Sequence, residues 1–326
     1  MRSFTLTTVA DIPAALEAGR RGGRFIAGGT TLVDLMRHHV EQPDALIDIT
    51  GLPLREIALT GDGSLRIGAL ATMADTAAHP EVRDRFPVVA QALELSASAQ
   101  LRHMATIGGN ILQRTRCTYF RDVSASCNKR APGSGCPAVG GINRGHAILG
   151  TSEHCIAPHA SDVCVAFAAL EAIVVLRGPN GERAVRFSDF LLQPGETPER
   201  EHDLRPGELV TAVEIPGYPP NLRSGYLKVR DRQSYEFALT SAAVALHIPD
   251  GVIRTAKVAV GGVGTVPWRL PGVEQALLGR RPEAAVWADA ASGAADGAKL
   301  LPQNGFKADL LVRTVERQLR IVGGGL

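Results

Sequence analysis

The sequence predicts an α+β protein of more than one domain, and three observations indicate this class. Short helix and strand patterns alternate up to about residue 110. A segment at about 111–160 then lacks apolar periodicity, and a run of strands closed by a helix follows Pro216, Pro219 and Pro220. With 326 residues, 45% hydrophobic and 21% charged, the chain is long enough to bury two or three domain cores.

Charge and hydropathy argue against two classes of partner. The formal net charge is +2, which is too small to indicate binding to nucleic acid or to an anionic membrane. The longest apolar stretches, such as Ala166–Ala172, are too short to insert across a bilayer. No hydrophobic signal core follows Met1, so we expect a cytoplasmic protein, or a periplasmic one co-exported with a partner that carries the signal.

The first 50 residues predict a small βαβ-like lobe. We expect a helix over Ile12–Ala18, a buried strand over Arg24–Ala27, helical spacing over Thr31–His38 and a second strand over Ala45–Ile49. The next strand, Leu65–Ala69, opens a second region. In that region Thr72 is expected to cap a helix through Ala78, and Pro87–Ala97 to form a longer helix.

Regular structure resumes after residue 160. Ser161 and Asp162 form a good cap for the apolar helix Val163–Leu170. The expected strands beyond it are Ile173–Leu176, Ala184–Phe187, Glu208–Ile215, Gly225–Arg230, Ala242–Ile248 and Ile253–Val260, and a helix is expected at Lys307–Val322. The prolines after Ile215 predict a linker, and therefore a separate C-terminal α+β domain.

Two Gly-Gly loops are candidates for holding phosphate. In the first, Ala27, Gly28, Gly29, Thr30, Thr31 and Leu32 join a strand to a helix. Glycine lets the backbone approach a ligand closely, and free N–H groups before a helix suit a pyrophosphate. The second loop places Gly108 and Gly109 between Thr106 and Asn110. The first is neither a Rossmann motif nor a P-loop, since no Lys follows, and a glycine turn with a threonine helix cap explains it equally.

Together the two loops resemble those of the FAD-binding subunits of the xanthine dehydrogenase, or molybdenum hydroxylase, family. That family shows A-G-G-T/Q-x-L, then T-I-G-G-N, then Ser-Asp, and here these are Ala27–Leu32, Thr106–Asn110 and Ser161-Asp162. The resemblance implies an FAD-binding fold of the vanillyl-alcohol-oxidase (PCMH) type in two subdomains. It further implies a C-terminal domain of the CO-dehydrogenase flavoprotein type.

The resemblance also implies domain limits and FAD contacts. Subdomain 1 is expected at 1–55, subdomain 2 at 56–220 with the insertion at about 111–160, and the C-terminal domain at 221–326. Lys228, on a strand of that last domain, matches a lysine that approaches the flavin, although it could also be a solvated strand residue. The residues implied to bind FAD are Ala27, Gly28, Gly29, Thr30, Thr31, Leu32, Met104, Thr106, Gly109, Asn110, Asp162 and Lys228.

The insertion holds four of the five cysteines. Their spacing, Cys117-x9-Cys127-x8-Cys136-x18-Cys155, contains no C-x2-C pair and is a weak signal by itself. Four thiolates in one Gly- and Arg-rich loop suit a cubane cluster, whereas a zinc site and free surface cysteines are the alternatives. Cys164 is expected to pack in the apolar helix. His103, His146 and His154 are expected to be hydrogen-bonded or solvated residues.

The insertion resembles those of two narrower groups, the flavin subunits of bacterial periplasmic aldehyde oxidoreductase and of 4-hydroxybenzoyl-CoA reductase. It looks closer to the first in the runs Gln113–Cys117, Lys129–Cys136 and Ile142–His146. Both groups carry a 4Fe-4S cluster there, which implies one on Cys117, Cys127, Cys136 and Cys155. The implied function is electron transfer through FAD to an external acceptor, beside a large molybdenum-cofactor subunit and a small 2Fe-2S subunit. No catalytic residue is expected in this chain. A stand-alone flavoenzyme and a zinc-binding interaction protein remain the alternatives.

Overall fold

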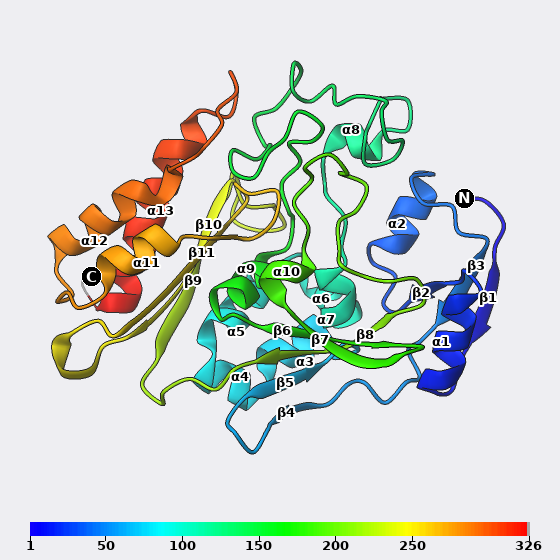
Figure 1. Ribbon diagram of the computed structural model, residues 1–326, viewed down its shortest axis with the longest axis horizontal. Helices are drawn as coiled ribbons and strands as arrows, with labels where there is room; N and C mark the ends of the chain where they lie inside the picture. Colours follow the sequence, from blue (N-terminus) through cyan, green and yellow to red (C-terminus); the bar gives the residue numbers. More distant parts are fainter. Residues whose placement is uncertain (325–326) are drawn as a thin grey trace.

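A computed structural model describes residues 1–324, and its three β-sheets follow one another along the chain (Figure 1). The first sheet joins β1 (Thr5–Thr8), β2 (Arg24–Ile26) and β3 (Ala45–Asp48), all parallel, in the order β1-β3-β2. Helices α1 (Ile12–Arg20) and α2 (Leu32–Arg37) connect them. The predicted βαβ-like lobe is therefore present, with β1 added at one edge.

The second sheet has five antiparallel strands in the order β4-β5-β8-β6-β7. Their bounds are β4 (Ile57–Leu59), β5 (Leu65–Gly68), β6 (Ile173–Gly178), β7 (Gly181–Arg186) and β8 (Leu209–Ile215). The accompanying helices are α3 (Met73–Ala78), α4 (Pro80–Arg85), α5 (Pro87–Glu94), α6 (Ala99–Met104), α7 (Ile107–Ile111), α9 (Asp162–Ala169) and α10 (Phe187–Phe190). Thr72 caps α3 as expected, because its side chain accepts the N–H of Asp75.

The third sheet is antiparallel in the order β12-β11-β10-β9. Its strands are β9 (Arg223–Val229), β10 (Thr240–His247), β11 (Thr255–Gly261) and β12 (Trp268–Arg269), and its helices are α11 (Pro271–Leu277), α12 (Ala284–Ala291) and α13 (Phe306–Gly323). Successive side chains of a strand point to opposite faces. Val244 and Leu246 therefore pack in the core under these helices, whereas Ala243 and Ala245 join the core of the second sheet.

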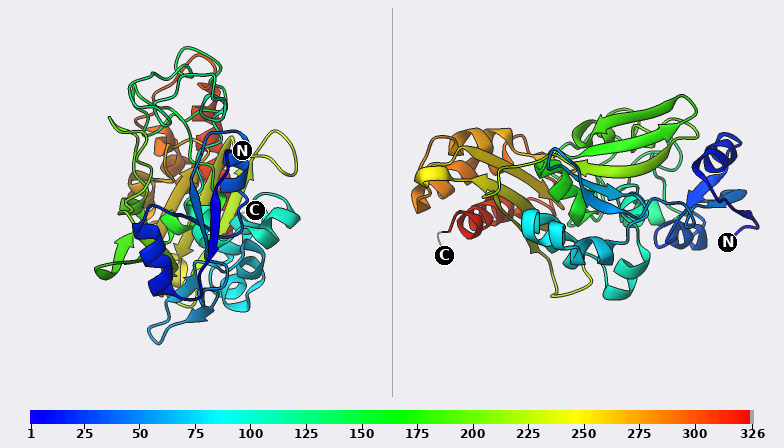
Figure 2. Two further views of the ribbon diagram at one scale, coloured as in Figure 1. Left: turned by 90° about the vertical axis from the view of Figure 1, so that its right-hand side faces the viewer. Right: turned by 90° about the horizontal axis from the view of Figure 1, so that it is seen from below.

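Residues 112–160 contain one short helix, α8 (Thr118–Arg121). Figure 1 shows this segment as loops at one end of the molecule, above the sheets and between α13 and α2. Figure 2 shows the same segment rising beyond the layered part of the fold. The prediction that these residues lack long helices and strands is confirmed.

Sequence patterns missed or misplaced several elements. Strand β1 was not expected, because all four of its residues are exposed and give no apolar alternation. The helix expected over Pro87–Ala97 ends at Glu94, and Ala97 has a positive φ of 48°, which is incompatible with its continuation. No helix within residues 1–324 combines the length and apolarity needed to cross a membrane.

Candidate functional site

The two Gly-Gly loops touch one another through their backbones. A Cβ added to Gly28 would lie 1.8 Å from the carbonyl oxygen of Met104, so only glycine permits this approach. Backbone bonds fix the second loop: Met73 N–H donates to Ala105 O at 2.8 Å, and Ile107 N–H donates to Ala71 O at 2.9 Å. The relative position of the loops is therefore set by main-chain contacts.

The first loop presents backbone donors that no other part of residues 1–324 uses. The N–H groups of Gly29, Thr30 and Thr31 have no hydrogen-bond partner in that range, and the Thr31 side chain makes no capping bond. Gly29 has a φ of +68°, in the left-handed region that favours glycine. Successive free N–H groups around such a residue form a concavity suited to a phosphate oxygen.

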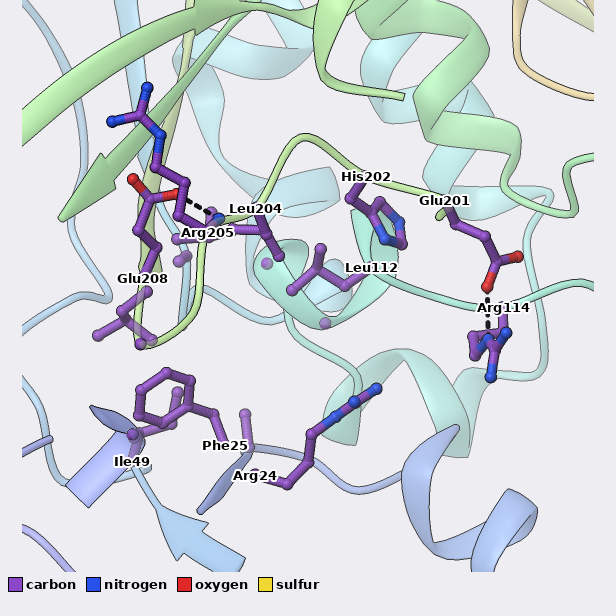
Figure 3. A pocket seen from close by; sticks show the side chains of 18 of the residues that line it. Arg24, Phe25, Ile49, Leu112, Arg114, Glu201, His202, Leu204, Arg205 and Glu208 are labelled. Carbon is purple, nitrogen blue, oxygen red and sulfur yellow. Dashed lines mark hydrogen bonds and ion pairs between the residues drawn. The ribbon is translucent and has the colours of Figure 1, made fainter. Parts of the chain in front are cut away.

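A cleft of about 580 Å³ opens between the first lobe and the second domain (Figure 3). Phe25 and Ile49 line it from the lobe, and Leu112 and Leu204 line it from the domain, as Figure 3 shows. Ala27, Thr106, Gly108 and Gly109 also line the cleft. A dinucleotide could therefore lay an apolar ring against these walls while the two loops hold its phosphates.

Thr106 and Asn110 are both buried and serve the second loop. The Thr106 hydroxyl accepts the N–H of Gly109 at 3.2 Å and so caps α7. The side-chain oxygen of Asn110 accepts hydrogen bonds from the side-chain amide of Gln113, at 3.1 Å, and from the hydroxyl of Ser161. These bonds connect the second loop to the start of α9, and the predicted site residues in both places are thereby brought together.

Asp162 lies at the start of α9 inside a polar cluster. Its carboxylate accepts bonds from Tyr226 Oη at 2.7 Å, Lys228 Nζ at 2.8 Å and Ser96 Oγ at 3.0 Å. The Lys228 side chain is only 1% exposed, so the alternative of a solvated strand residue is wrong. Burial, and next the charge of Asp162, raise the pKa of Tyr226 well above its ordinary value.

The sequence interpretation missed Ser96 and Tyr226. Tyr226 precedes Lys228 by two residues on β9, so both side chains lie on the same face of the strand. Strand alternation could therefore have found Tyr226, whereas no local pattern indicates Ser96. Asp162 and Tyr226 line a second chamber of about 300 Å³, which also contains Cys117 and His146.

The remaining predicted FAD contacts lie around the two loops. Gly28, Gly29 and Thr30 line a shallow pocket beside α2. Leu32 begins α2 and is half-buried. The side chain of Met104 is 58% exposed, although its carbonyl lies against Gly28. All predicted residues except Lys228 thus lie at the loops, the cleft or the chamber. Lys228 is connected to the chamber by its bond to Asp162.

Four cysteines line one small cavity inside the 111–160 segment. Cys117, Cys127, Cys136 and Cys155 all contribute to its wall. Within residues 1–324, no three His, Cys, Asp or Glu side chains are close enough to form a ready-made metal site. Burial raises the pKa of the Cys117 thiol to about 11, although the N–H groups of Phe120 and Tyr119 act against this shift. The donor chemistry fits an iron–sulfur cluster, but the ligand geometry is not preformed.

Cys164 has a different environment from the other four. It is fully buried in α9, and burial raises the pKa of its thiol to about 12. The expectation that Cys164 packs in the apolar helix is confirmed.

Four basic residues of the segment pair with carboxylates elsewhere in the protein, whereas Arg130 donates to the backbone carbonyls of Tyr119 and Ala125. Arg114 pairs with Glu201 and, at 2.7 Å, with Glu41. Arg116 and Arg121 pair with Asp34 on α2, the first at 3.3 Å. Lys129 pairs with Glu201 at 3.0 Å. These pairs connect the segment to the rest of the protein, and burial raises the pKa of the Cys155 thiol while the charge of Lys129 acts to lower it.

Comparisons with known proteins match this architecture. Residues 1–218 match the family described as the FAD binding domain in molybdopterin dehydrogenase, and residues 225–314 match the CO dehydrogenase flavoprotein C-terminal domain. The chain is 49% identical over 280 residues to the aldehyde oxidoreductase FAD-binding subunit PaoB of Escherichia coli, covering 85% of this chain and 86% of that one.

More distant relatives share the same arrangement. The carbon monoxide dehydrogenase medium chain of Hydrogenophaga pseudoflava is 27% identical, covering 84% of this chain and 77% of its own. A solved structure of carbon monoxide dehydrogenase from that organism superposes with a TM-score of 0.78 at 23% identity, over 99% of this chain and 98% of that one. The predicted fold class is thereby confirmed, and the chain belongs to the family of FAD-binding medium subunits of molybdenum hydroxylases.

Proposed function

We propose that this chain is the electron-transfer subunit of a molybdenum hydroxylase of the aldehyde oxidoreductase type, and that it carries both FAD and a 4Fe-4S cluster. The observation that carries the proposal is the meeting of two Gly-Gly loops at the edge of a cleft, with free backbone donors on the first loop. The likeness to a subunit named for aldehyde oxidoreductase supports the choice of enzyme class.

The FAD would be held mainly by main-chain groups. The N–H groups of Gly29, Thr30 and Thr31 would bind one phosphate, and the loop at Thr106 and Gly109 would bind beside it. Asp162, oriented by Tyr226 and Lys228, would face the ribityl or ring end from the second chamber. When bound, the flavin supplies the electron-carrying chemistry, and these residues hold and orient it.

Partner subunits would perform the substrate chemistry. A large subunit with a molybdenum cofactor would oxidise the substrate, and a small subunit with 2Fe-2S clusters would pass the electrons to this chain. Several relatives are named as medium chains or subunits, which supports a place for this chain in an assembly of several subunits. The electrons would leave this chain to an external acceptor.

The cluster would be bound by Cys117, Cys127, Cys136 and Cys155. These four thiols share one cavity in a segment with almost no regular secondary structure. Metal–thiolate bonds formed on assembly would add their free energy to folding, so the segment would be ordered further by the cluster. The absence of a ready-made ligand group in residues 1–324 means that the thiols must converge during assembly.

FAD binding is tested by the flavin that the protein releases. Protein denatured after purification should yield FAD in the supernatant, in about one equivalent per chain. Recovery of FMN alone, or of no flavin, would contradict the assignment of the two loops. The isolated chain should also lack aldehyde dehydrogenation, and robust turnover without partners would instead favour a stand-alone flavoenzyme.

The cluster is tested by five single Cys→Ser variants prepared without oxygen. Iron and acid-labile sulfide should be lost in the variants at positions 117, 127, 136 and 155. Cys164→Ser is the control, because its thiol is buried in α9, outside the cavity that the other four cysteines share. It should retain iron at a stability cost of roughly 1 kcal/mol for burying a hydroxyl. Full iron in any of the first four variants, or zinc in the wild type, would reject the assignment.

A further inference from the structure

His146 makes a specific contact with one of the four cysteines. Its Nε2 lies 3.2 Å from the Sγ of Cys117, and the two residues are 29 positions apart in the sequence. The residue is only 7% exposed, so water does not compete freely for this contact. The sequence predicted only that His146 is a hydrogen-bonded or solvated residue. In the structure it has a defined sulfur partner.

The structure anchors the backbone of His146 and places Tyr119 beside its ring. The His146 N–H donates to Asn143 O at 2.9 Å, and its carbonyl accepts Lys307 Nζ at 3.0 Å. Lys307 is completely buried on α13 and also donates to Gly145 O at 2.9 Å and Gly262 O at 2.8 Å. The ring of Tyr119 lies with its centroid 6.4 Å from that of His146. The backbone of His146 is therefore anchored to the C-terminal domain, and its ring lies beside Tyr119 and Cys117.

The other side chains around the cavity give no equivalent contact. Cys155 receives the backbone N–H of Ala157 at 3.5 Å. The second histidine on the cavity wall, His154, is paired at 2.9 Å with Glu196, which is almost fully exposed. Among the four cysteines, Cys117 therefore has the one imidazole contact found in residues 1–324.

Cys117 and His146 also occupy a boundary between two cavities. Both line the cysteine cavity, and both line the chamber that contains Asp162 and Tyr226. None of the other three cysteines lines that chamber. The contact thus lies in the wall between the proposed cluster site and the proposed flavin site.

We propose that His146 donates a hydrogen bond from Nε2 to the Cys117 sulfur of the bound cluster and thereby raises its reduction potential. The inference rests on the proposed 4Fe-4S function. One-electron reduction adds negative charge that the ligand sulfurs share, and an N–H donor stabilises that charge more in the reduced state. His146 is a positioning residue, since four cysteine sulfurs already complete the ligand set of a cubane cluster.

The experiment is a redox titration of the full-length protein, purified without oxygen and followed by electron paramagnetic resonance. His146→Leu removes the donor, and His146→Gln keeps an N–H donor on a side chain of similar reach. His154→Leu is the matched control, because this histidine lines the same cavity but bonds to Glu196. Iron and sulfide per chain are counted in every sample before the titration.

We expect His146→Leu to retain iron and to disfavour reduction roughly tenfold, which for one electron is a fall of about 59 mV. His146→Gln should lie between it and the wild type, and His154→Leu should match the wild type. Loss of iron from both His146 variants would make His146 a ligand and overturn the inference, as would unchanged potentials. If the wild type itself holds no iron, the cluster proposal fails first. If only His146→Leu fails to fold, the Gln variant still decides.

Discussion

The two proposed cofactor regions differ in the kinds of contact that hold them in place. The flavin loops are fixed by main-chain contacts between strands and helices, with Gly28 against the Met104 carbonyl and Ala105 bonded to Met73. The cysteine segment is held by backbone bonds, such as that from Ile148 N–H to Val263 O at 2.8 Å, and in addition by side chains that bond to its backbone. The Asn143 amide donates to three carbonyls of residues 138–141, and Asn128 bonds to His154 O and Gly135 N. A loop inserted outside the sheets has no continuous ladder of backbone bonds, so side chains satisfy part of its backbone.

This difference predicts where glycines matter. Gly28→Ala should be the most damaging small change, since the new Cβ would lie 1.8 Å from Met104 O and force the two flavin loops apart. We expect FAD to be lost from the purified protein, and the free energy of unfolding to fall by about 3 kcal/mol or more. Flavin absorbance and chemical denaturation measure the two effects.

A matched glycine in the cysteine segment sharpens the test. Gly140 is exposed, and a Cβ there would meet nothing within 4 Å. Gly140→Ala should keep flavin, iron and stability at wild-type values. Equal damage from both substitutions would show that the close approach of Gly28 to Met104 O is not the cause of the loss.

The same difference explains how far the sequence could predict the site. A loop that needs glycine for close backbone approach shows this in a short local motif, and Gly28 is such a residue. Side-chain anchors leave no such motif, because their partners are remote in sequence. Asp34 lies more than 80 residues before Arg116 and Arg121, and Lys307 lies more than 150 after the carbonyls of Gly145 and His146.

The prediction of helices and strands is limited in the same way, because it depends on local sequence patterns. Buried strands with regular alternation or continuous apolar runs, such as β6 and β10, were found within a few residues of their bounds. The exposed strand β1 and the short helices α6 and α7 were not found. The cleft could not be predicted from the sequence either, because residues 199–208 complete its wall only after β7 and β8 pair with β6.

The second prediction concerns Glu201, which anchors the cysteine segment through Arg114 and Lys129. Glu201→Gln should destabilise the protein by about 3 kcal/mol, because it leaves two largely buried cations without this partner. Burial raises the pKa of the Glu201 carboxyl, but the charges of Lys129 and Arg114 outweigh it and hold the pKa below its ordinary value of 4.5.

The pH dependence of stability tests the same anchor. A carboxyl whose pKa is lower in the folded state contributes stability that is present above about pH 4.5 and is lost as pH falls through the folded pKa. The Gln variant should lose less stability than the wild type over this acid range. Parallel pH curves for the two proteins, measured by chemical denaturation, would contradict the role of Glu201.

A third substitution tests the connection between the two regions. Asp34 on α2 pairs with Arg116 and Arg121 of the cysteine segment and lines the pocket beside Gly28 and Gly29. Asp34→Asn should cost about 1 kcal/mol, since the carboxylate is 36% exposed and solvent screens the pairs. FAD should also dissociate more readily, because α2 is held less firmly behind the first loop.

The Asp34 experiment needs a control from the same lobe. Arg20 and Glu17 form an exposed pair on α1, and Glu17→Gln should leave FAD dissociation unchanged. An increase in FAD dissociation in both variants would assign the effect to the charge of the lobe. An increase in Asp34→Asn alone would show that the cysteine segment supports the flavin loop.

The smallest effect is expected at Arg144, although its contacts are extensive. The guanidinium makes two bonds to Asp231, at 2.8 and 3.0 Å, and lies 5.1 Å from the centre of the Phe306 ring. Both members of the pair are about half exposed, at 51% and 52%, so solvent and salt weaken the attraction. Arg144→Ala should therefore lower the free energy of unfolding by at most about 1 kcal/mol, and less in high salt. A loss as large as that of Glu201→Gln would mean that surface pairs anchor the segment as strongly as buried ones. Denaturation at two ionic strengths decides, because only a screened pair loses its contribution when salt is added.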